Sequence, residues 1–182
     1  DGLRPAYLSE RDGVRHLMSQ PSDSSTPAES LLTSESEELF PGSWSADGRS
    51  LVFVHNPPTD NSEVRVLQIE GRQATALTGI PARSNRPAIS PDGRWLAFGV
   101  APSESSGRPA IYVRPFPGPG PSRQFVDAAG QPGWSRDGRK IFEGLLGKQA
   151  LIPPSRIASS QPLPTGSSSG LPIALLVLGA LV

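Results

Sequence analysis

Apolar and polar residues alternate in this chain over short runs, and clusters of Gly, Pro, Ser and Asp separate one run from the next. The run that follows Gly93 shows the pattern: Leu96 and Phe98 fall on one face of an extended segment, and Trp95 and Ala97 fall on the other. Short alternating runs between turn residues are typical of β-strands. No segment has a convincing amphipathic helical period, so we expect an all-β fold.

A tight turn precedes this strand, and the turn recurs along the chain. Asp92 can hydrogen-bond to the backbone inside the turn, and Gly93 supplies the positive φ that ends it. Asp-Gly pairs of this repeat begin at residues 1, 47, 92 and 137, so the steps between them are 46, 45 and 45 residues, and a further pair at 12–13 lies outside this spacing. The turn positions expected to be equivalent are Asp47 and Gly48, Asp92 and Gly93, and Asp137 and Gly138.

Each period also contains three further strand-like segments in a fixed order. The second strand-like segments are 16–18, 64–69 and 111–113, the third are 31–33, 76–78 and 125–126, and the fourth are 40–45, 86–90 and 131–135. Four strands in a period of this length predict β-propeller blades, each of which needs its neighbours to bury its apolar faces. The chain holds about three repeats and a partial fourth, so we expect part of a larger propeller or an open array with exposed edges.

The run 90–98, Ser-Pro-Asp-Gly-Arg-Trp-Leu-Ala-Phe, resembles the WD40-like Pro-Asp propeller repeats of bacterial proteins such as the TolB family. The run 111–120, which contains Arg-Pro-Phe-Pro-Gly-Pro-Gly, resembles propeller regions attached to bacterial serine/threonine protein kinases. The resemblance covers residues 1–152 and implies TolB-like blades of four antiparallel strands. Ala46 and Arg136 replace the turn proline, and Glu143 replaces an aromatic residue, so the last repeat departs from the pattern.

The composition argues against several classes of function. The 182 residues contain 17 Lys and Arg and 17 Asp and Glu, so the formal charge is zero and no nucleic-acid partner is expected. Cys is absent, which excludes disulfides and thiolate metal sites. The Asp residues of the turns are solitary, whereas a calcium loop spaces several oxygen ligands closely. We therefore expect neither a metal nor any other cofactor.

The sequence also lacks motifs for catalysis. It contains no phosphate-binding loop and no kinase signature. Its one Gly-x-Ser-x-Gly string, at 166–170, lies in the Pro- and Ser-rich stretch that is expected to form a flexible linker, and not in the strand–turn–helix setting of a nucleophile elbow. The two histidines, His16 and His55, are expected to be packing or surface residues rather than a general base. We expect no catalytic residue and no enzymatic activity in this chain, although a parent protein could carry a kinase or hydrolase domain.

Three arginines, Arg49, Arg94 and Arg139, follow the turn glycines at one repeat position. In one interpretation they form a basic arc that binds a ligand on one propeller face. In the other they are solvated or paired with the acid of their own turn.

Trp44 and Trp134 are expected in the core between blades. The run 114–120 is either a rigid Pro-rich docking loop or a structural connection between strands.

The repeat ends at Ile152, and a different composition follows. Residues 153–170 are rich in Pro and Ser and are expected to form a flexible linker. The tail 171–182 is almost purely apolar, but its length as a helix is only about 18 Å, against about 30 Å for a hydrocarbon core. The tail is a truncated membrane span, a sequence end altered by truncation or frameshift, or a lipid-anchor signal.

Two classes of function agree with these observations. The first is a non-catalytic binding or sensor module with a protein or peptide partner, as part of a kinase-linked or TolB-like protein. The second is the substrate-gating propeller of a prolyl-oligopeptidase-like serine hydrolase, which carries similar repeats. We favour the first, because residues 153–182 do not begin a hydrolase domain. The resemblance implies a periplasmic or cell-surface location, with membrane attachment through the tail or through other parts of the parent chain as an alternative.

Overall fold

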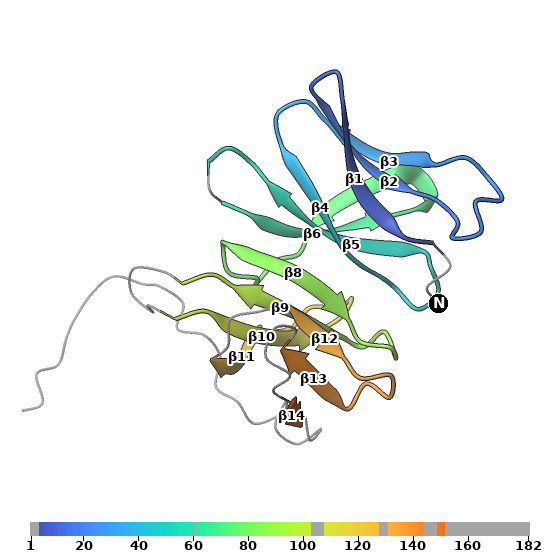
Figure 1. Ribbon diagram of the computed structural model, residues 1–182. Coiled ribbons are helices and arrows are strands. Elements are labelled where there is room, and N and C mark those ends of the chain that lie inside the picture. Colours follow the sequence, from blue (N-terminus) through green and yellow to red (C-terminus); the bar gives the residue numbers. More distant parts are fainter. Residues whose placement is uncertain (1–3, 60, 103–107, 128–130, 144–148, 152–182) are drawn as a thin grey trace, which may run out of the picture.

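A computed structural model describes residues 4–59, 61–102, 108–127, 131–143 and 149–151. These residues form four antiparallel β-sheets, which follow one another along the chain (Figure 1). The first sheet contains β1 (Ala6–Arg11), β2 (Val14–Ser19) and β3 (Glu29–Ser34), and the second contains β4 (Glu38–Trp44), β5 (Ser50–Asn56), β6 (Glu63–Gln68) and β7 (Gln73–Ala76). The third sheet contains β8 (Ser84–Ile89), β9 (Trp95–Val100), β10 (Ala110–Pro115) and β11 (Arg123–Asp127), and the fourth contains β12 (Pro132–Trp134), β13 (Lys140–Glu143) and β14 (Gln149–Leu151).

The second and third sheets confirm the expected blades of four antiparallel strands. In both sheets the strands lie side by side in sequence order, with β4 and β8 at one edge and β7 and β11 at the other. The edge strand β8 contacts both β4 and β12, so the first strands of successive sheets stack on one another. By position in the repeat, β1 corresponds to β5, β9 and β13. Within the described residues, the first sheet therefore lacks a counterpart of β4.

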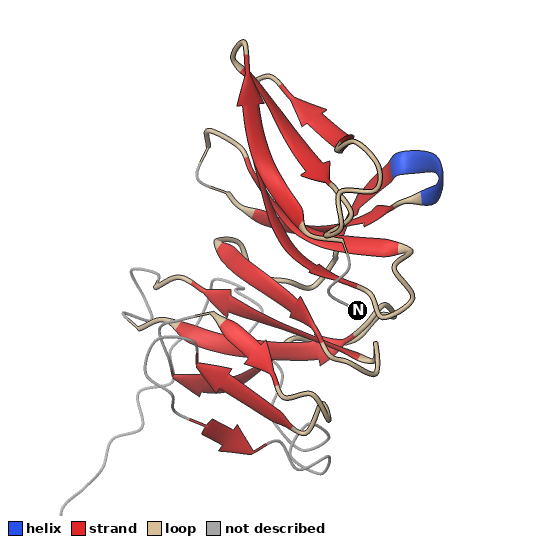
Figure 2. Cartoon of the chain, turned by 45° about the vertical axis from the view of Figure 1, so that its right-hand side comes forward, coloured by secondary structure: helices blue, strands red, loops and turns tan. Residues whose placement is uncertain are grey.

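The all-β expectation is also confirmed, because the described residues contain strands and one short 3₁₀-helix, η1 (Glu70–Arg72) (Figure 2). The Asp-Gly pair at residues 1 and 2 lies outside the described residues, as do the expected linker 153–170 and tail 171–182. None of the described helices is long and apolar enough to span a membrane.

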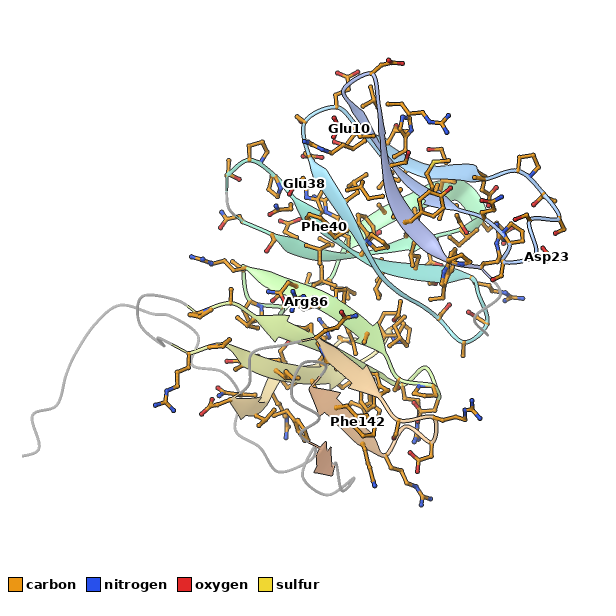
Figure 3. All side chains as sticks on the ribbon, in the orientation of Figure 1. Glu10, Asp23, Glu38, Phe40, Arg86 and Phe142 are labelled. Carbon is orange, nitrogen blue, oxygen red and sulfur yellow. The ribbon has the colours of Figure 1, made fainter. Side chains whose placement is uncertain are left out.

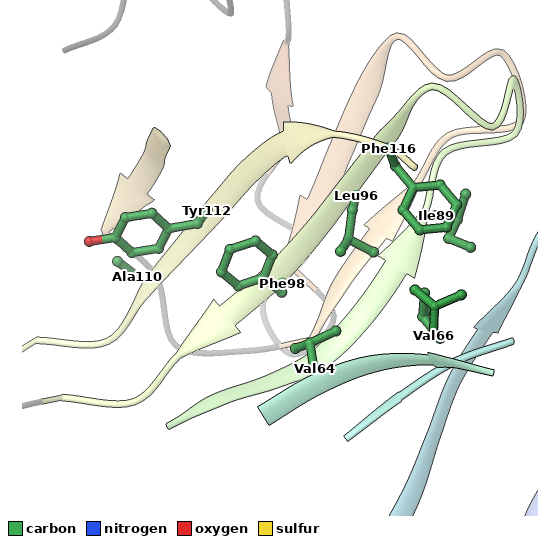
Figure 4. Close-up of a cluster of buried hydrophobic side chains, with 9 residues drawn as sticks. Val64, Val66, Ile89, Leu96, Phe98, Ala110, Tyr112 and Phe116 are labelled. Carbon is green, nitrogen blue, oxygen red and sulfur yellow. The ribbon is translucent and has the colours of Figure 1, made fainter. Parts of the chain in front are cut away.

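The core lies between the sheets, because each central strand buries side chains on both of its faces. Leu51 and Phe53 of β5 pack toward the first sheet, whereas Val52 packs toward the third. Between the second and third sheets, Val64 and Val66 face side chains of β8, β9 and β10 (Figure 4). A further cluster joins β9 and β10 to β13 through Ala97, Ile111, Val113 and Ile141.

Three positions expected to be equivalent, Leu51, Leu96 and Ile141, are all buried. Removal of a side chain of this size from water stabilises a fold by about 1.5–3 kcal/mol. Trp44 and Trp134 also pack against core clusters, as expected. The repeated sequence therefore places similar apolar side chains at each successive junction between sheets.

One expected strand is shifted. The sequence predicts a third strand of the second period at 76–78, but β7 occupies Gln73–Ala76. The chain reverses directly after β6 through η1, where Gly71 has a φ of 78°. Since β7 is an edge strand and is mostly exposed, its side chains show no apolar alternation that would identify it.

The run 114–120 is held as a structural connection. Arg114 is 2% exposed. Its Nη1 donates to the carbonyl of Thr78, and its Nη2 donates to the carbonyl of Gly118 at 3.1 Å. Burial lowers the pKa of this guanidinium. Because Arg114 joins the end of β10 to the segment after β7, the observed contacts favour the structural interpretation over a free docking loop.

Candidate functional site

A serine that was not among the expected turn residues organises each of the repeated Asp-Gly turns at residues 47, 92 and 137. In the β8–β9 turn, the Ser90 hydroxyl donates to Asp92 Oδ1 at 2.5 Å. The Ser90 Oγ itself accepts the backbone N–H of Trp95 at 3.0 Å. Asp92 Oδ1 also accepts the backbone N–H of Arg94 at 3.1 Å, and Gly93 closes the turn with a φ of 71°.

The other two copies repeat this geometry. The Ser45 hydroxyl lies 2.6 Å from Asp47 Oδ1, and the Ser135 hydroxyl lies 2.5 Å from Asp137 Oδ1. The φ angles of the two remaining turn glycines are 69° at Gly48 and 68° at Gly138. All six expected turn residues thus take part in one repeated backbone structure. The signal for the serine was its recurrence two residues before each Asp.

The hydrogen bonds of the turns favour the ionised form of their carboxyl groups. The pKa values of Asp47, Asp92 and Asp137 are all lowered, and in each case the largest cause is the hydroxyl of the turn serine. At Asp92, partial burial opposes this effect. Local hydrogen-bond donors therefore stabilise the ionised form of the turn carboxyl groups. Within the described ranges, no cluster of three or more His, Asp or Glu residues could hold a metal ion.

The three arginines of the expected binding face are exposed, and each follows its turn glycine. Arg94 pairs with the acid of its own turn, with Nε 2.8 Å from Asp92 Oδ2. The backbone N–H groups of Arg49 and Arg139 donate to Asp47 and Asp137, both at 3.1 Å. A ligand role for these arginines stays a prediction.

A buried histidine pairs with a carboxylate, but the geometry is not that of a nucleophilic triad. His55 Nε2 lies 2.6 Å from Glu37 Oε2, and the Ser34 hydroxyl donates to the same oxygen at 3.3 Å. The carboxylate therefore lies between the hydroxyl and the imidazole, whereas a triad needs the imidazole in the middle to accept the proton of the nucleophile. The hydrogen bond from His55 is the main reason that the pKa of Glu37 is lowered.

A groove between the second and third sheets is the strongest candidate for ligand binding. Its volume is about 640 Å³, within the range of about 300–1,000 Å³ that is typical of ligand sites. Phe40 of β4 and Arg86 of β8 line it from opposite sheets, and both side chains lie where the two sheets face each other (Figure 3). Its other lining residues come from β5, β8, β9, β10 and the segments around them: Val54, Asn85, Gly99, Val100, Ala101, Pro102, Pro109 and Ala110.

Phe40 is an apolar side chain that the fold leaves open to this groove. It pairs across the sheet with Val54 of β5, yet its side chain is 43% exposed. A large exposed aromatic residue in a concave surface can make a favourable contact with a ligand, because the ligand can bury its apolar area.

Arg86 supplies a charge at the same place. Its φ is 49°, a conformation that few residues other than glycine adopt. The cause is a β-bulge, seen as a shift in the β8–β9 register between Asn85 and Ala88. Bulges re-aim side chains and are frequent beside functional sites. Among the described residues, no acidic side chain forms an ion pair with Arg86.

The sequence analysis did not identify this pair. The signal that could have found Arg86 is a difference between repeats: counted back from the turn serines, Pro41, Arg86 and Gln131 occupy one position. The fold of the repeat does not require a charged residue at this position, because the position varies between otherwise similar repeats. A charge there is therefore a candidate for a role in binding. Phe40 stands at the neighbouring position, where the next repeat has Asn85.

Comparison with known proteins supports the fold. No protein-family model matches the chain. A TolB homolog of Chlorobaculum tepidum is 35% identical over 77 residues, which are 42% of this chain and 17% of that protein. A solved structure described as TolB from Agrobacterium tumefaciens aligns with 79% of this chain and 50% of its own chain, at a TM-score of 0.64 and 23% identity. The chain has a TolB-like β-propeller fold.

A relative of another kind shares part of the same sequence. The uncharacterized peptidase YuxL of Bacillus subtilis is 36% identical over 61 residues, which are 34% of this chain and 9% of that protein. The chain thus spans less than a fifth of the length of each of these two relatives.

Proposed function

We propose that this chain is a non-catalytic binding module that recognises a polypeptide in the groove between its second and third sheets. The observation that carries the proposal is that an exposed aromatic residue, Phe40, and an arginine, Arg86, which has no ion-pair partner among the described residues, line a mostly apolar groove from opposite sheets. An extended peptide with a carboxylate beside apolar side chains would satisfy both residues. The TolB-like fold supports a protein-interaction module.

A selection from a random peptide library tests this proposal. The purified full chain is immobilised, and the selected peptides are then measured against Arg86→Ala and Phe40→Ala. Arg94→Ala is the matched control, since it removes an exposed arginine that does not line the groove. We expect enriched peptides with an acidic residue beside apolar ones, and weaker binding for the two groove variants alone. A selection that enriches nothing, or peptides that bind Arg86→Ala as well as the parent, would contradict the proposal.

The parent protein is proposed to be TolB-like or linked to a bacterial serine/threonine kinase, and to act outside the cytoplasm. The support is the repeat motif and the run 111–120. A second candidate, the gating propeller of a serine hydrolase, is favoured by the sequence match to a peptidase. The full-length gene separates the two: a kinase domain and membrane span upstream support the first, and a hydrolase domain with a nucleophile elbow downstream supports the second.

A further inference from the structure

Asp12 and Gly13 form an Asp-Gly pair outside the repeat, and their turn is built differently from the repeated ones. The pair connects β1 to β2 as a two-residue turn, because Arg11 and Val14 on either side of it are paired across the two strands. Both turn residues have a positive φ, 52° at Asp12 and 78° at Gly13. This is the tight hairpin connection that Asp-Gly favours. Glu10 stands where the repeated turns have their serine.

The carboxyl group of Asp12 has no hydrogen-bond donor within the part of the chain that the structure describes. In the repeated turns, by contrast, one carboxylate oxygen accepts two donors, the hydroxyl of the turn serine and the backbone N–H of the residue after the glycine. These hydrogen bonds lower the pKa values of the three repeated carboxyl groups and so favour the ionised form. An ionised carboxylate is a poor electrophile, because its oxygen cannot leave as water without a proton.

The backbone nitrogen that follows each Asp shows the same contrast. In the turn at 47–48, the N–H of Gly48 donates to the carbonyl of Ser45 at 2.9 Å, and the equivalent distance is 2.8 Å in each of the other two repeated turns. The N–H of Gly13 has no acceptor among the described residues. In the Asp12–Gly13 pair, both the carboxyl group and the adjacent backbone nitrogen are therefore free of the contacts that hold them in the repeated turns.

The surroundings of this turn also allow it to open. Residues 10–13 are all exposed, and the turn lies at the tip of the β1–β2 hairpin, at the top of the view in Figure 1. The ion pair between Glu10 and Arg15, at 3.4 Å, joins two side chains that are both accessible to solvent. Local opening of an exposed hairpin tip breaks few contacts and so requires little free energy.

We propose that Asp12 is a site of spontaneous covalent modification, at which the residue is converted to isoaspartate through a succinimide. The backbone nitrogen of Gly13 attacks Cγ of the protonated Asp12 side chain and forms a new N–Cγ bond. The nitrogen gives up its proton, and one carboxyl oxygen leaves as water. A water molecule then adds to the main-chain carbonyl carbon of the ring and breaks its bond to the nitrogen. The reaction releases one water and consumes one, so it needs no other reactant.

The product changes the main chain at the tip of the hairpin. The chain then continues through Cβ and Cγ of residue 12, which lengthens it by one carbon atom, and a free carboxylate remains on Cα. Because the length of a hairpin connection sets its turn geometry, we expect the pairing of Arg11 with Val14 to be lost in the modified chain. The repeated turns should keep their structure.

Ageing of the purified full chain in neutral buffer at physiological temperature tests this inference. Endoproteinase Asp-N cleaves before Asp but not before isoaspartate, so digestion followed by mass spectrometry measures the modified fraction at residues 12, 47, 92 and 137. We expect several-fold more isoaspartate at residue 12 than at each of the other three. A sample aged in guanidinium chloride is the control, because the four pairs have the same Asp-Gly sequence and should react at similar rates in the unfolded chain.

The variant Ser45→Ala tests whether the turn serine protects its aspartate. Loss of this hydroxyl should raise the isoaspartate at Asp47 several-fold, whereas Asp92 and Asp137 should stay as unreactive as in the parent, which shows that the variant remains folded. The inference is overturned if the folded chain forms isoaspartate no faster at Asp12 than at Asp47, or forms none at Asp12 while the unfolded chain does. It is also overturned if Asp47 reacts no faster in Ser45→Ala than in the parent.

Discussion

The hydroxyl of Ser90 lies 2.5 Å from Oδ1 of Asp92, and this contact sets the geometry of the turn between β8 and β9. Ser90 is 2% exposed although it stands in a turn. The same contact recurs in two further turns. The serine thus joins the turn carboxylate to the first backbone N–H of the next strand.

Ser90→Ala should destabilise the fold by about 1–3 kcal/mol, because the partly buried N–H of Trp95 loses its acceptor. Urea unfolding of the variant and the parent measures the difference. Ser43→Ala is a control for the turn carboxyl group, because its hydroxyl accepts the N–H of Ile89 from the neighbouring sheet. An NMR titration should find the pKa of Asp92 unchanged in Ser43→Ala and raised in Ser90→Ala. Equal stability of Ser90→Ala and the parent would contradict the assigned role of the serine.

The turn carboxylates should make the fold less stable in acid. Their pKa values are lowered from the ordinary value of 3.8. A folded-state pKa below the unfolded one gives a stabilisation that is present above about pH 4 and is lost as the pH falls through the folded values. Glu37 acts in the same direction. Urea unfolding at pH 6 and at pH 3 measures the loss.

Asp92→Asn is the control for the acid prediction. The amide keeps an oxygen acceptor at this position but cannot ionise, so the difference in stability between pH 6 and pH 3 should be smaller than in the parent. A parent that is as stable at pH 3 as at pH 6 would show that the turn carboxylates do not favour the folded state.

Gly93 should be far less replaceable than its neighbour. Its φ of 71° lies in the region where a β-branched side chain is strained, although an added Cβ would meet nothing within 4 Å. Gly93→Val should cost about 1–3 kcal/mol. Arg94→Ala should stay within about 0.5 kcal/mol, because the arginine is exposed and pairs only with Asp92 among the described residues. If the two variants lose equal stability in urea, the arginine has a structural role that its exposure does not reveal.

Much of the fold is predictable from the sequence, because turns and strand alternation are local. Residues close in sequence determine the Asp-Gly turns and the equivalent core positions Leu51, Leu96 and Ile141. The steps of about 45 residues also allow the assignment of each repeat to be checked against the next one. The groove could not be predicted in this way. Phe40 and Arg86 come from different sheets, and their approach depends on how β4 stacks on β8. The positive φ of Arg86 in the bulge could not be predicted either, because no Gly stands at that position to indicate it.

The stacking of β4 on β8 should depend on Gly42. An added Cβ there would lie 2.5 Å from the carbonyl oxygen of Pro87 and 2.9 Å from that of Val52, so backbone would have to move. Gly42→Ala should therefore cost about 1–3 kcal/mol and widen the groove. Gly133→Ala in β12 is the matched control, because its Cβ would meet nothing within 4 Å. Thermal unfolding of both variants checks the prediction, which fails if they have the same midpoint.

The most direct test of a polypeptide site in the groove is a double-mutant cycle by isothermal titration calorimetry. Its components are Arg86→Ala and a selected peptide whose acidic residue is changed to the matching amide. A charge-assisted hydrogen bond is worth about 1.5–3 kcal/mol, so each single change should weaken binding by about 10- to 100-fold. The two together should weaken it little more than either alone. Additive losses, or an Arg86→Ala variant that binds as tightly as Arg94→Ala, would contradict the account.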